Sequence, residues 1–269
     1  LLDRFLEYSR EPLPRGSNGS MIPIEGPPFS AFVFKIQTNM NPQHRDRMVF
    51  ARVCSGKFER DMTVWNTRSR REVRISNSHS MFGRERETAD EAYAGDIIGF
   101  VTNADFRIGD TLSTDPELRY NEIPRFAPEC FAYVQNVSSS SYKSFRKGLD
   151  HLLAEDIVQS FFLKNHQGNL PLLGAVGPLQ FEVLQYRLKD EYGVDSNLEM
   201  KPWSVTRWLG DAEGTNGGSL SLPHGCAEGA DDRGRPVILF SDIWSMQYFT
   251  GNNPRIRLYD SPEHSSEPN

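Results

Sequence analysis

Short segments in which apolar and polar residues alternate make up the chain from residue 29 to about residue 112. Alternation with a period of two is typical of β-strands that bury one face. In the first segment, Phe32, Phe34 and Ile36 fall on the same face. The same pattern predicts further strands at 49–53, 73–75, 96–101 and 108–112. Because no helical pattern interrupts them, and glycines lie where turns would fall, the segment predicts a small closed β-barrel.

The apolar period changes after residue 128, which indicates a second domain. A helix is expected from Pro178, which suits a first turn, to Tyr192, because Gly193 supplies a stop. In order, the pattern predicts a strand at 129–136, a helix at 142–153, strands at 158–164 and 170–176, a helix at 178–192 and a strand at 197–205. This β-α-β-β-α-β order is the ferredoxin-like arrangement of an α+β domain.

The two ends of the chain lack this regularity. The first residues show helical spacing of apolar side chains, and residues 11–28 are rich in Pro, Gly and Ser, like a linker. We therefore expect residues 1–28 to be the end of an upstream domain's helix and a linker. The β-barrel is then expected at 29–125, and the α+β domain with a C-terminal extension at 126–269. Within that extension, the glycine-rich segment 211–235 is expected to form a loop.

Composition excludes several classes of protein. Of the 269 residues, 38% are hydrophobic, which is enough for packed cores, and no run approaches the roughly 18 apolar residues of a membrane helix. The charged start at Asp3 and Arg4 is unlike a signal peptide, so we expect a cytoplasmic protein without membrane contact. Cys54, Cys130 and Cys226 are isolated in sequence, without the spacing of a zinc site, so no metal site is expected.

The charge is unevenly distributed along the chain. The formal net charge of −6 disfavours a general nucleic-acid binder, but residues 35–74 contain ten basic and four acidic residues, a local net charge of +6. Several of these arginines fall in and after a predicted turn, where guanidinium groups can reach phosphates. A solvated charged hairpin explains them equally well. The candidate phosphate-contacting residues are His44, Arg45, Arg47, Lys57, Arg68, Arg70, Arg71 and Arg74.

No arrangement of residues typical of catalysis is evident. The sequence has no GxxxxGK[ST] phosphate loop, so we expect this chain to hold no nucleotide or other cofactor and to be no enzyme. His44 has no partner nucleophile or carboxylate pair, so a surface contact is favoured over acid–base chemistry. Gly174 and Gly177 mark a strand-to-helix junction, where a tight turn is favoured over an anion site because no Lys or Ser/Thr follows.

Several segments resemble a known protein family. They are FVFKIQTNMNPQHRDR at 32–47, RVCSGKF at 52–58, AGDIIG at 94–99, IGDT at 108–111, GAVGPLQFEV at 174–183 and RLKDEYGV at 187–194. The first is similar to the start of the second domain in the release factor 3 family of translational GTPases. The fifth is similar to a strand–helix junction of that family. The resemblance runs from residue 1 to about residue 209, thins over the glycine-rich segment and returns weakly at 240–258.

The resemblance implies the second and third domains of such a factor, without its GTPase domain. The chain would then be the ribosome-binding portion of a termination factor that promotes the departure of class I release factors in a GTP-dependent cycle. GTP and Mg²⁺ would bind in the upstream GTPase domain. The implied partners are small-subunit ribosomal RNA and proteins, that GTPase domain and, indirectly, a class I release factor. The candidate basic residues would face ribosomal RNA.

Three other functions remain open on the sequence. The corresponding part of another translational GTPase, such as elongation factor G or a ribosomal protection protein, is disfavoured by HRDR at 44–47 and GAVGPLQF at 174–181. A metabolic enzyme with a barrel and a ferredoxin-like domain would need titratable residues that converge in a pocket, which the sequence does not show. A free-standing RNA-binding protein is disfavoured by the helical, uncapped start at Leu1.

Overall fold

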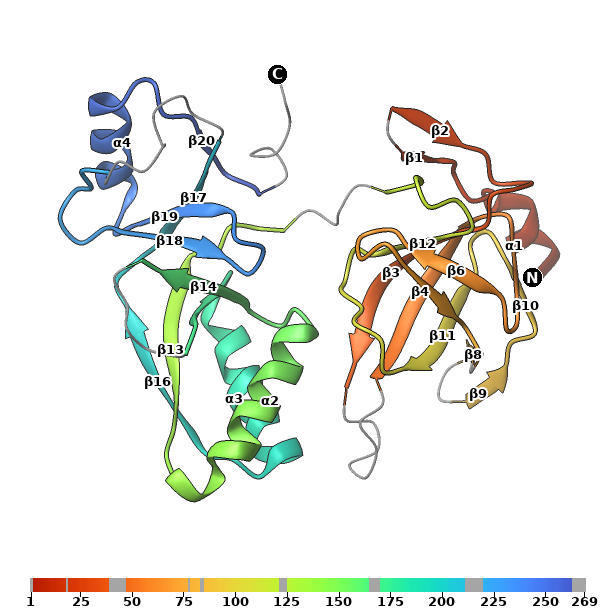
Figure 1. Cartoon of the computed structure of the whole chain (residues 1–269), viewed down its shortest axis with the longest axis horizontal. Coiled ribbons are helices and arrows are strands. Elements are labelled where there is room, and N and C mark those ends of the chain that lie inside the picture. The colour runs from red at the N-terminus through yellow and green to blue at the C-terminus, as the bar shows by residue number, and fades with distance from the viewer. Residues whose placement is uncertain are drawn as a thin grey trace. The chain divides into compact units, whose positions relative to one another are not determined.

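A computed structural model shows two compact units, residues 1–123 (unit 1) and 124–269 (unit 2) (Figure 1). The structure describes residues 2–17, 19–38, 47–76, 78–82, 85–120, 125–164, 170–210 and 220–262. Within these residues, no helix is both long and apolar enough to cross a membrane.

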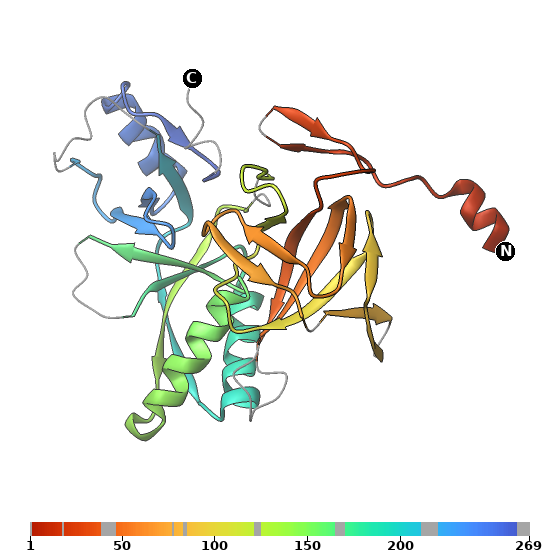
Figure 2. The same cartoon turned by 45° about the vertical axis from the view of Figure 1, so that its right-hand side comes forward.

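Unit 1 consists mainly of β-strands (Figures 1 and 2). In chain order its described elements are α1 (Leu2–Tyr8), β1 (Arg15–Ser17), β2 (Ser20–Ile22), β3 (Ser30–Gln37), β4 (Arg47–Ser55), β5 (Lys57–Glu59), β6 (Thr63–Asn66), β7 (Arg71–Arg74), β8 (Ser78–Phe82), β9 (Glu85–Thr88), β10 (Glu91–Tyr93), β11 (Ile97–Thr102) and β12 (Thr111–Ser113). One sheet has the order β7-β6-β12-β3-β4-β11-β8-β9, and β10–β5 and β1–β2 form two-stranded sheets.

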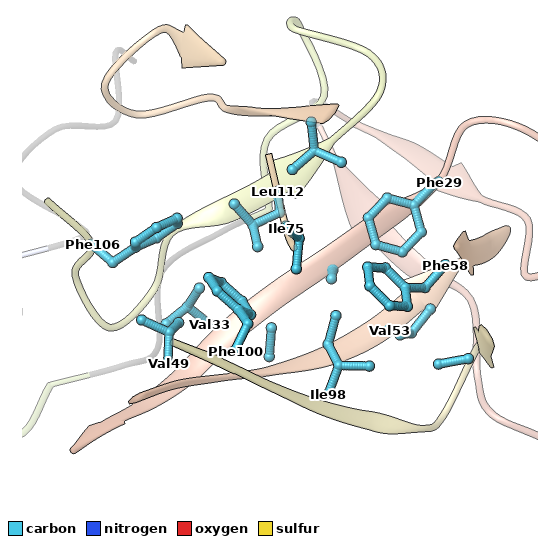
Figure 3. Close-up of a cluster of buried hydrophobic side chains, with 14 of the residues drawn as sticks. Phe29, Val33, Val49, Val53, Phe58, Ile75, Ile98, Phe100, Phe106 and Leu112 are labelled. Atoms are coloured by element: carbon cyan, nitrogen blue, oxygen red, sulfur yellow. The ribbon is translucent and has the colours of Figure 1, made fainter. Parts of the chain in front are cut away.

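The long sheet of unit 1 curls around a hydrophobic cluster, shown in Figure 3. Val49, Ala51 and Val53 of β4 all point into this cluster and are fully buried, as the alternating pattern predicts. The rings of Phe100 and Phe106 pack edge to face inside it, with centroids 5.4 Å apart. The predicted β-barrel is therefore confirmed, but the closure predicted with it is not. Among the described strands, its hydrogen-bonded ladder is open between β7 and β9.

Strand β3 departs from the predicted alternation. Its register with β4 shifts between Val33 and Lys35, which places a β-bulge at Phe34. A bulge adds one residue to one strand, so the residues beyond it change faces. As a result Val33 and Ile36 both point into the barrel core, Phe34 is 36% exposed, and Phe32 belongs to a separate cluster. The prediction that Phe32, Phe34 and Ile36 share one face is therefore wrong.

The segment 11–28, predicted to be a linker, contains the β1–β2 hairpin and belongs to unit 1. Ser17 Oγ donates a hydrogen bond to the Arg119 carbonyl at 2.7 Å. The Arg15 guanidinium lies 4.0 Å from the centre of the Phe32 ring, a cation–π contact. The linker prediction is wrong here because Pro, Gly and Ser mark turns equally well, and the contacts that hold the hairpin come from residues distant in sequence.

Unit 2 joins helices to a second antiparallel sheet (Figure 1). Its described elements are β13 (Cys130–Asn136), the 3-10 helix η1 (Ser139–Ser141), α2 (Tyr142–Ala154), β14 (Gln159–Leu163), β15 (Leu172–Ala175), α3 (Pro178–Tyr192), β16 (Ser196–Lys201), β17 (Val205–Leu209), β18 (Ala227–Asp231), β19 (Pro236–Phe240), α4 (Ile243–Asn252) and β20 (Leu258–Tyr259). The sheet order is β16-β13-β15-β14-β18-β19-β17-β20. Its first half confirms the ferredoxin-like β-α-β-β-α-β prediction.

Two predictions for the second half of unit 2 need correction. The strand predicted at 197–205 is two strands, β16 and β17, which Pro202 separates because it has no N–H to donate to a ladder. The loop predicted at 211–235 contains β18, while residues 211–219 lie outside the described part of the chain. A Cβ at Gly229 would lie 2.5 Å from the Phe162 carbonyl oxygen, so this glycine permits a close strand approach rather than marking a loop.

The two faces of the unit 2 sheet are covered differently. Helices α2 and α3 pack side by side on one face, where Phe145, Phe181 and Leu184 are buried (Figure 1). The opposite face is covered by the sheet's own second half, because β13, β14, β15, β17 and β19 contribute to one shared cluster. Thr206 Oγ1 on β17 donates to the Pro128 carbonyl at 2.8 Å and joins the two halves. The C-terminal extension is therefore part of the unit 2 core.

Candidate nucleic-acid interface

The β6–β7 hairpin carries four of the basic residues singled out by the sequence. Its strands pair Asn66 with Arg71 and Thr63 with Arg74, so residues 67–70 form the connecting turn. Arg70 has a left-handed backbone (φ 51°) at the end of that turn. Arg70, Arg71 and Arg74 are exposed, as a phosphate contact requires.

The fourth basic residue, Arg68, is only partly exposed and is held by residues that precede β12. Its Nε and Nη2 atoms donate to the two carboxylate oxygens of Asp110 at 2.5 and 3.1 Å, and Nη2 also donates to the Asp105 carbonyl at 3.0 Å. Burial lowers the pKa of Arg68, but the hydrogen bonds and the charge of Asp110 outweigh it and raise that pKa above its usual value. Arg68 therefore has a structural role in this hairpin.

Asp110 organises the base of the hairpin. Its side chain is only 2% exposed and also accepts hydrogen bonds from Asn66 Nδ2 at 2.7 Å and from the Arg107 backbone N–H at 2.9 Å. Asn66 Oδ1 in turn accepts a hydrogen bond from the Ser69 N–H at 3.2 Å. These bonds fix the turn against the start of β12, so the exposed arginines project from a rigid support.

Sequence reasoning missed the role of Asp110. A signal was present, because an acidic residue stands directly before the buried segment Thr111–Ser113. Buried carboxylates require partners, so that position could have been paired with one of the nearby arginines. The partner itself could not be identified, because Arg68 and Asp110 are distant in sequence.

Lys57 is also engaged in local pairs. Its Nζ lies 2.7 Å from a carboxylate oxygen of Glu91 and 3.4 Å from one of Glu59. The hydrogen bond that Lys57 donates to Glu91 raises the pKa of Lys57, and the same bond lowers the pKa of Glu91. The Tyr93 hydroxyl donates to Glu91 at 2.9 Å. Two neighbouring carboxylates thus offset the positive charge of Lys57, which makes it a weaker candidate for phosphate contact than the hairpin arginines.

The remaining basic candidates fall at residues 44–47. Arg47 begins β4, pairs with Thr102 of β11 and is half-buried. His44 and Arg45 lie outside the described residues. The proposed interface therefore depends on the hairpin arginines Arg70, Arg71 and Arg74.

The strand-to-helix turn between β15 and α3 is stabilised by one glutamine. Gln180 Oε1 accepts hydrogen bonds from the backbone N–H groups of Val176 at 2.7 Å and Gly177 at 3.4 Å. Gly177 is the N-cap of α3, and a Cβ at Gly174 would lie 2.7 Å from the Phe161 ring. Because Gln180 already occupies these amide donors, the geometry supports a packed turn over an anion site.

The described residues contain no cluster of three or more His, Cys, Asp or Glu side chains that could hold a metal ion. Two sets of partly buried ionic groups in unit 2 form local pairs. Asp231 is 4% exposed and accepts from Trp208 Nε1 at 3.0 Å and Arg235 Nε at 2.7 Å. Arg187 pairs with Glu155 at 2.5 Å and with Glu191. These groups join neighbouring elements of unit 2.

Two family models match the chain, one in each unit. Residues 28–115 match elongation factor G domain 2, and residues 120–250 match the C-terminal domain of class II release factor RF3. The first range contains the barrel with its hairpin. The second contains the ferredoxin-like half of unit 2 and most of its extension.

Curated relatives align with almost the whole chain. The peptide chain release factor 3 of Gloeobacter violaceus is 44% identical over 259 residues, which cover 96% of this chain and 49% of the relative. That of Synechococcus elongatus is 44% identical over 263 residues, covering 96% and 46%. The chain thus spans about half the length of the curated relatives it matches. A crystal structure from Thermus thermophilus matches with a TM-score of 0.54 at 18% identity, covering 76% of this chain and 30% of that one, which supports the fold alone.

Proposed function

Because this chain belongs to the peptide chain release factor 3 family, we propose that it is the ribosome-binding portion of a translation termination factor. In this proposal, the protein acts in a GTP-dependent cycle that promotes the departure of class I release factors from the ribosome. The alignment with a curated release factor of that name, which is 44% identical and covers 96% of this chain, supports the role. The match of its first unit to a domain of elongation factor G supports a position on the ribosome.

The nucleotide chemistry of the cycle is proposed to lie outside this chain. Phosphoryl transfer needs a phosphate loop and bound Mg²⁺, and the sequence contains no GxxxxGK[ST] motif. GTP and Mg²⁺ would therefore bind in a separate GTPase domain that is a direct partner of these units. This chain would contribute binding and positioning, and it would work in the cytoplasm, where ribosomes are found.

One observation carries the proposed contact with small-subunit ribosomal RNA. Arg70, Arg71 and Arg74 are exposed on a hairpin whose turn is fixed from inside by the Arg68–Asp110 pair. Within the described residues, Arg74 pairs with Asp61 at 3.3 Å, and both side chains are largely exposed. Exposed pairs of this kind contribute little free energy, so a phosphate can replace the carboxylate at small cost. A rigid, basic and exposed hairpin is suited to neutralising phosphates.

The test is ribosome binding across a salt series. Replacing Arg70, Arg71 and Arg74 with Ala should lower the affinity and reduce the slope of log affinity against log salt by about one unit for each lost phosphate contact. Replacement with Glu should lower the affinity further through repulsion. Circular dichroism should report normal folding, because exposed charge changes cost within about 0.5 kcal/mol.

A matched control places the same charge change elsewhere. Lys143, Lys147 and Lys189 are exposed on helices of unit 2, and their joint replacement with Glu changes the net charge as much as the hairpin variant does. A much smaller loss in this control would locate the effect at the hairpin. An unchanged affinity and salt slope in a folded hairpin variant would show that these arginines are a solvated surface.

A further inference from the structure

Helix α4 exposes an aromatic face that the core of unit 2 does not use. The exposed fractions are 57% for Ile243, 81% for Trp244 and 68% for Tyr248. Trp244 and Tyr248 are four positions apart, so their side chains follow each other along one side of the helix. Of this helix only Phe249 is fully buried, against Phe240 of β19 with ring centroids 5.7 Å apart. The exposed aromatic residues therefore are not explained by packing within unit 2.

The helix is held firmly in place beneath this face. Asp242 caps its N-terminus by accepting a hydrogen bond from the Ser245 backbone N–H at 2.7 Å. At the other end, the Asn253 N–H donates to the Phe249 carbonyl at 3.0 Å, and Ile256 packs into the same cluster as Phe249. Figures 1 and 2 show the helix lying against β19. The aromatic side chains are thus mounted on a defined surface, which lowers the entropy cost of binding.

Within residues 243–259 the charged side chains are cationic, and the acidic Asp242, which caps the helix, and Asp260 flank this range. Residues 243–259 include Arg255 and Arg257 and no Asp or Glu, although unit 2 as a whole contains more acidic than basic residues. Both arginines are exposed, in the segment that follows α4 directly. Neither forms an ion pair with the part of the chain that the structure describes. The local chemistry therefore combines flat aromatic rings with cations, which favours an anionic partner that carries aromatic rings.

We propose that Trp244 and Tyr248 stack on unpaired bases of RNA while Arg255 and Arg257 contact the adjoining phosphates. The proposal rests on the proposed function, since the ribosome supplies the RNA, and it names the partner chemistry of unit 2. Stacking on aromatic side chains is how proteins bind single-stranded RNA, because every base offers a flat face. A helix-binding groove on a protein partner would instead be matched by several branched aliphatic side chains, and this face offers only Ile243.

Binding is measured with the whole chain and a short, labelled single-stranded RNA by fluorescence anisotropy. Trp244→Ala with Tyr248→Ala should weaken binding about 25-fold or more, since each of the two lost base–aromatic stacks contributes about fivefold or more. Trp244→Phe with Tyr248→Phe should restore most of the affinity. Arg255→Glu with Arg257→Glu should weaken binding and flatten its salt dependence. Phe162→Ala, which removes an aromatic ring of unit 2 that is 56% exposed, should leave the affinity unchanged.

Tryptophan fluorescence gives a direct readout of stacking. Trp244 is far more exposed than the other three tryptophans: Trp208 is fully buried, and Trp65 and Trp203 are partly buried. Single-stranded RNA should therefore quench the intrinsic emission saturably, and Trp244→Phe should remove most of that quenching. A base-paired RNA of the same length should bind more weakly, because its bases are already stacked.

Wild-type RNA affinity in the folded Trp244→Ala, Tyr248→Ala variant would overturn the proposal. If that variant also lost crosslinks to a ribosomal protein, the face would be a protein-docking surface instead. The barrel variant of Arg70, Arg71 and Arg74 separates this outcome from the proposed function. Ribosome binding that depends on the barrel arginines, with RNA binding independent of α4, would refute only the stacking surface. If the barrel variant kept its ribosome binding and the α4 variant kept its RNA binding, both the proposed barrel contact and the stacking surface would be refuted.

Discussion

Replacing Asp110 with alanine should destabilise unit 1 by about 3 kcal/mol, at the lower end of the range for breaking a buried ion pair. The Asp110 side chain is 2% exposed and accepts hydrogen bonds from Arg68, from Asn66 Nδ2 and from the Arg107 N–H. Alanine would leave all of these donors without their acceptor. The value lies at the lower end because the Arg68 side chain is 24% exposed, so water can replace part of the lost interaction.

Asp105 provides the matched control for this substitution. Its carboxylate also faces Arg68, at 3.5 Å, but its side chain is 68% exposed. Exposed pairs contribute roughly 0–1 kcal/mol, so Asp105→Ala should change the stability of unit 1 by less than about 1 kcal/mol. The contrast between the two carboxylates isolates the effect of burial from that of charge.

The assay is amide hydrogen exchange at a series of urea concentrations, which follows each unit separately. A single unfolding curve for the whole chain is unsuitable, because a chain with two units need not unfold in one step. Asp110→Ala should reduce protection in unit 1, above all in β6 and β12, and leave unit 2 unchanged. A loss below about 1 kcal/mol, or one equal to that of Asp105→Ala, would refute the view that a buried clamp fixes the hairpin.

Three further predictions concern unit 2 and nucleotide binding. Gly174→Ala should destabilise unit 2 by about 1–3 kcal/mol in the same hydrogen-exchange assay, because its Cβ would lie 2.7 Å from the Phe161 ring. Gly177→Ser, with open space at that Cβ, should change the stability of unit 2 by less than about 0.5 kcal/mol. Burial raises the pKa of Asp156 despite the opposing charge of Arg125. The folded state therefore binds the proton of the Asp156 carboxyl more tightly than the unfolded state does. The free energy of unfolding should then fall as the pH rises from the pKa of the unfolded state through the raised pKa of the folded state. Asp156→Asn should abolish that part of the pH dependence, and asparagine tolerates the left-handed backbone at this position (φ 58°). An unchanged dependence of stability on pH between about pH 3 and 7 would contradict the assignment to Asp156. Isothermal titration of the whole chain with GTP and Mg²⁺ should give no saturable heat, because the sequence lacks a phosphate loop; micromolar binding would contradict this.

Helix α3 illustrates how far local signals extend. The helix begins at Pro178 and ends at Tyr192, the predicted bounds, because a proline in the first turn and Gly193 in the left-handed conformation (φ 65°) act within one turn of the chain. The β-α-β-β-α-β order was predictable for the same reason, since each element has its own apolar period. The family resemblance was also recognisable at this level.

The proposed RNA-contacting residues show where such signals stop. The sequence grouped Arg68 with the other hairpin arginines, because all four share a charge and a turn. In the folded chain, Arg68 turns inward to Asp110, and Lys57 pairs with Glu59 and Glu91. These partners could not be identified from local sequence, because strand pairing brings them together. Helix α4 itself was not predicted from the sequence, so its exposed aromatic face was missed with it.

The division between what the sequence predicted and what only the tertiary structure decided has a physical cause. Element type, element order and the charge of the hairpin depend on residues that are close in sequence. Their local conformational preferences act whatever the rest of the chain does. The bulge at Phe34, the packing of the β1–β2 hairpin on the barrel and the burial of Asp110 depend on contacts between distant segments. Such contacts exist only after the strands have paired and the cores have formed, because each must offset the entropy of closing a long loop. The chain's local pattern therefore specified the type and order of its main elements, and folding specified which side chains remain free to bind.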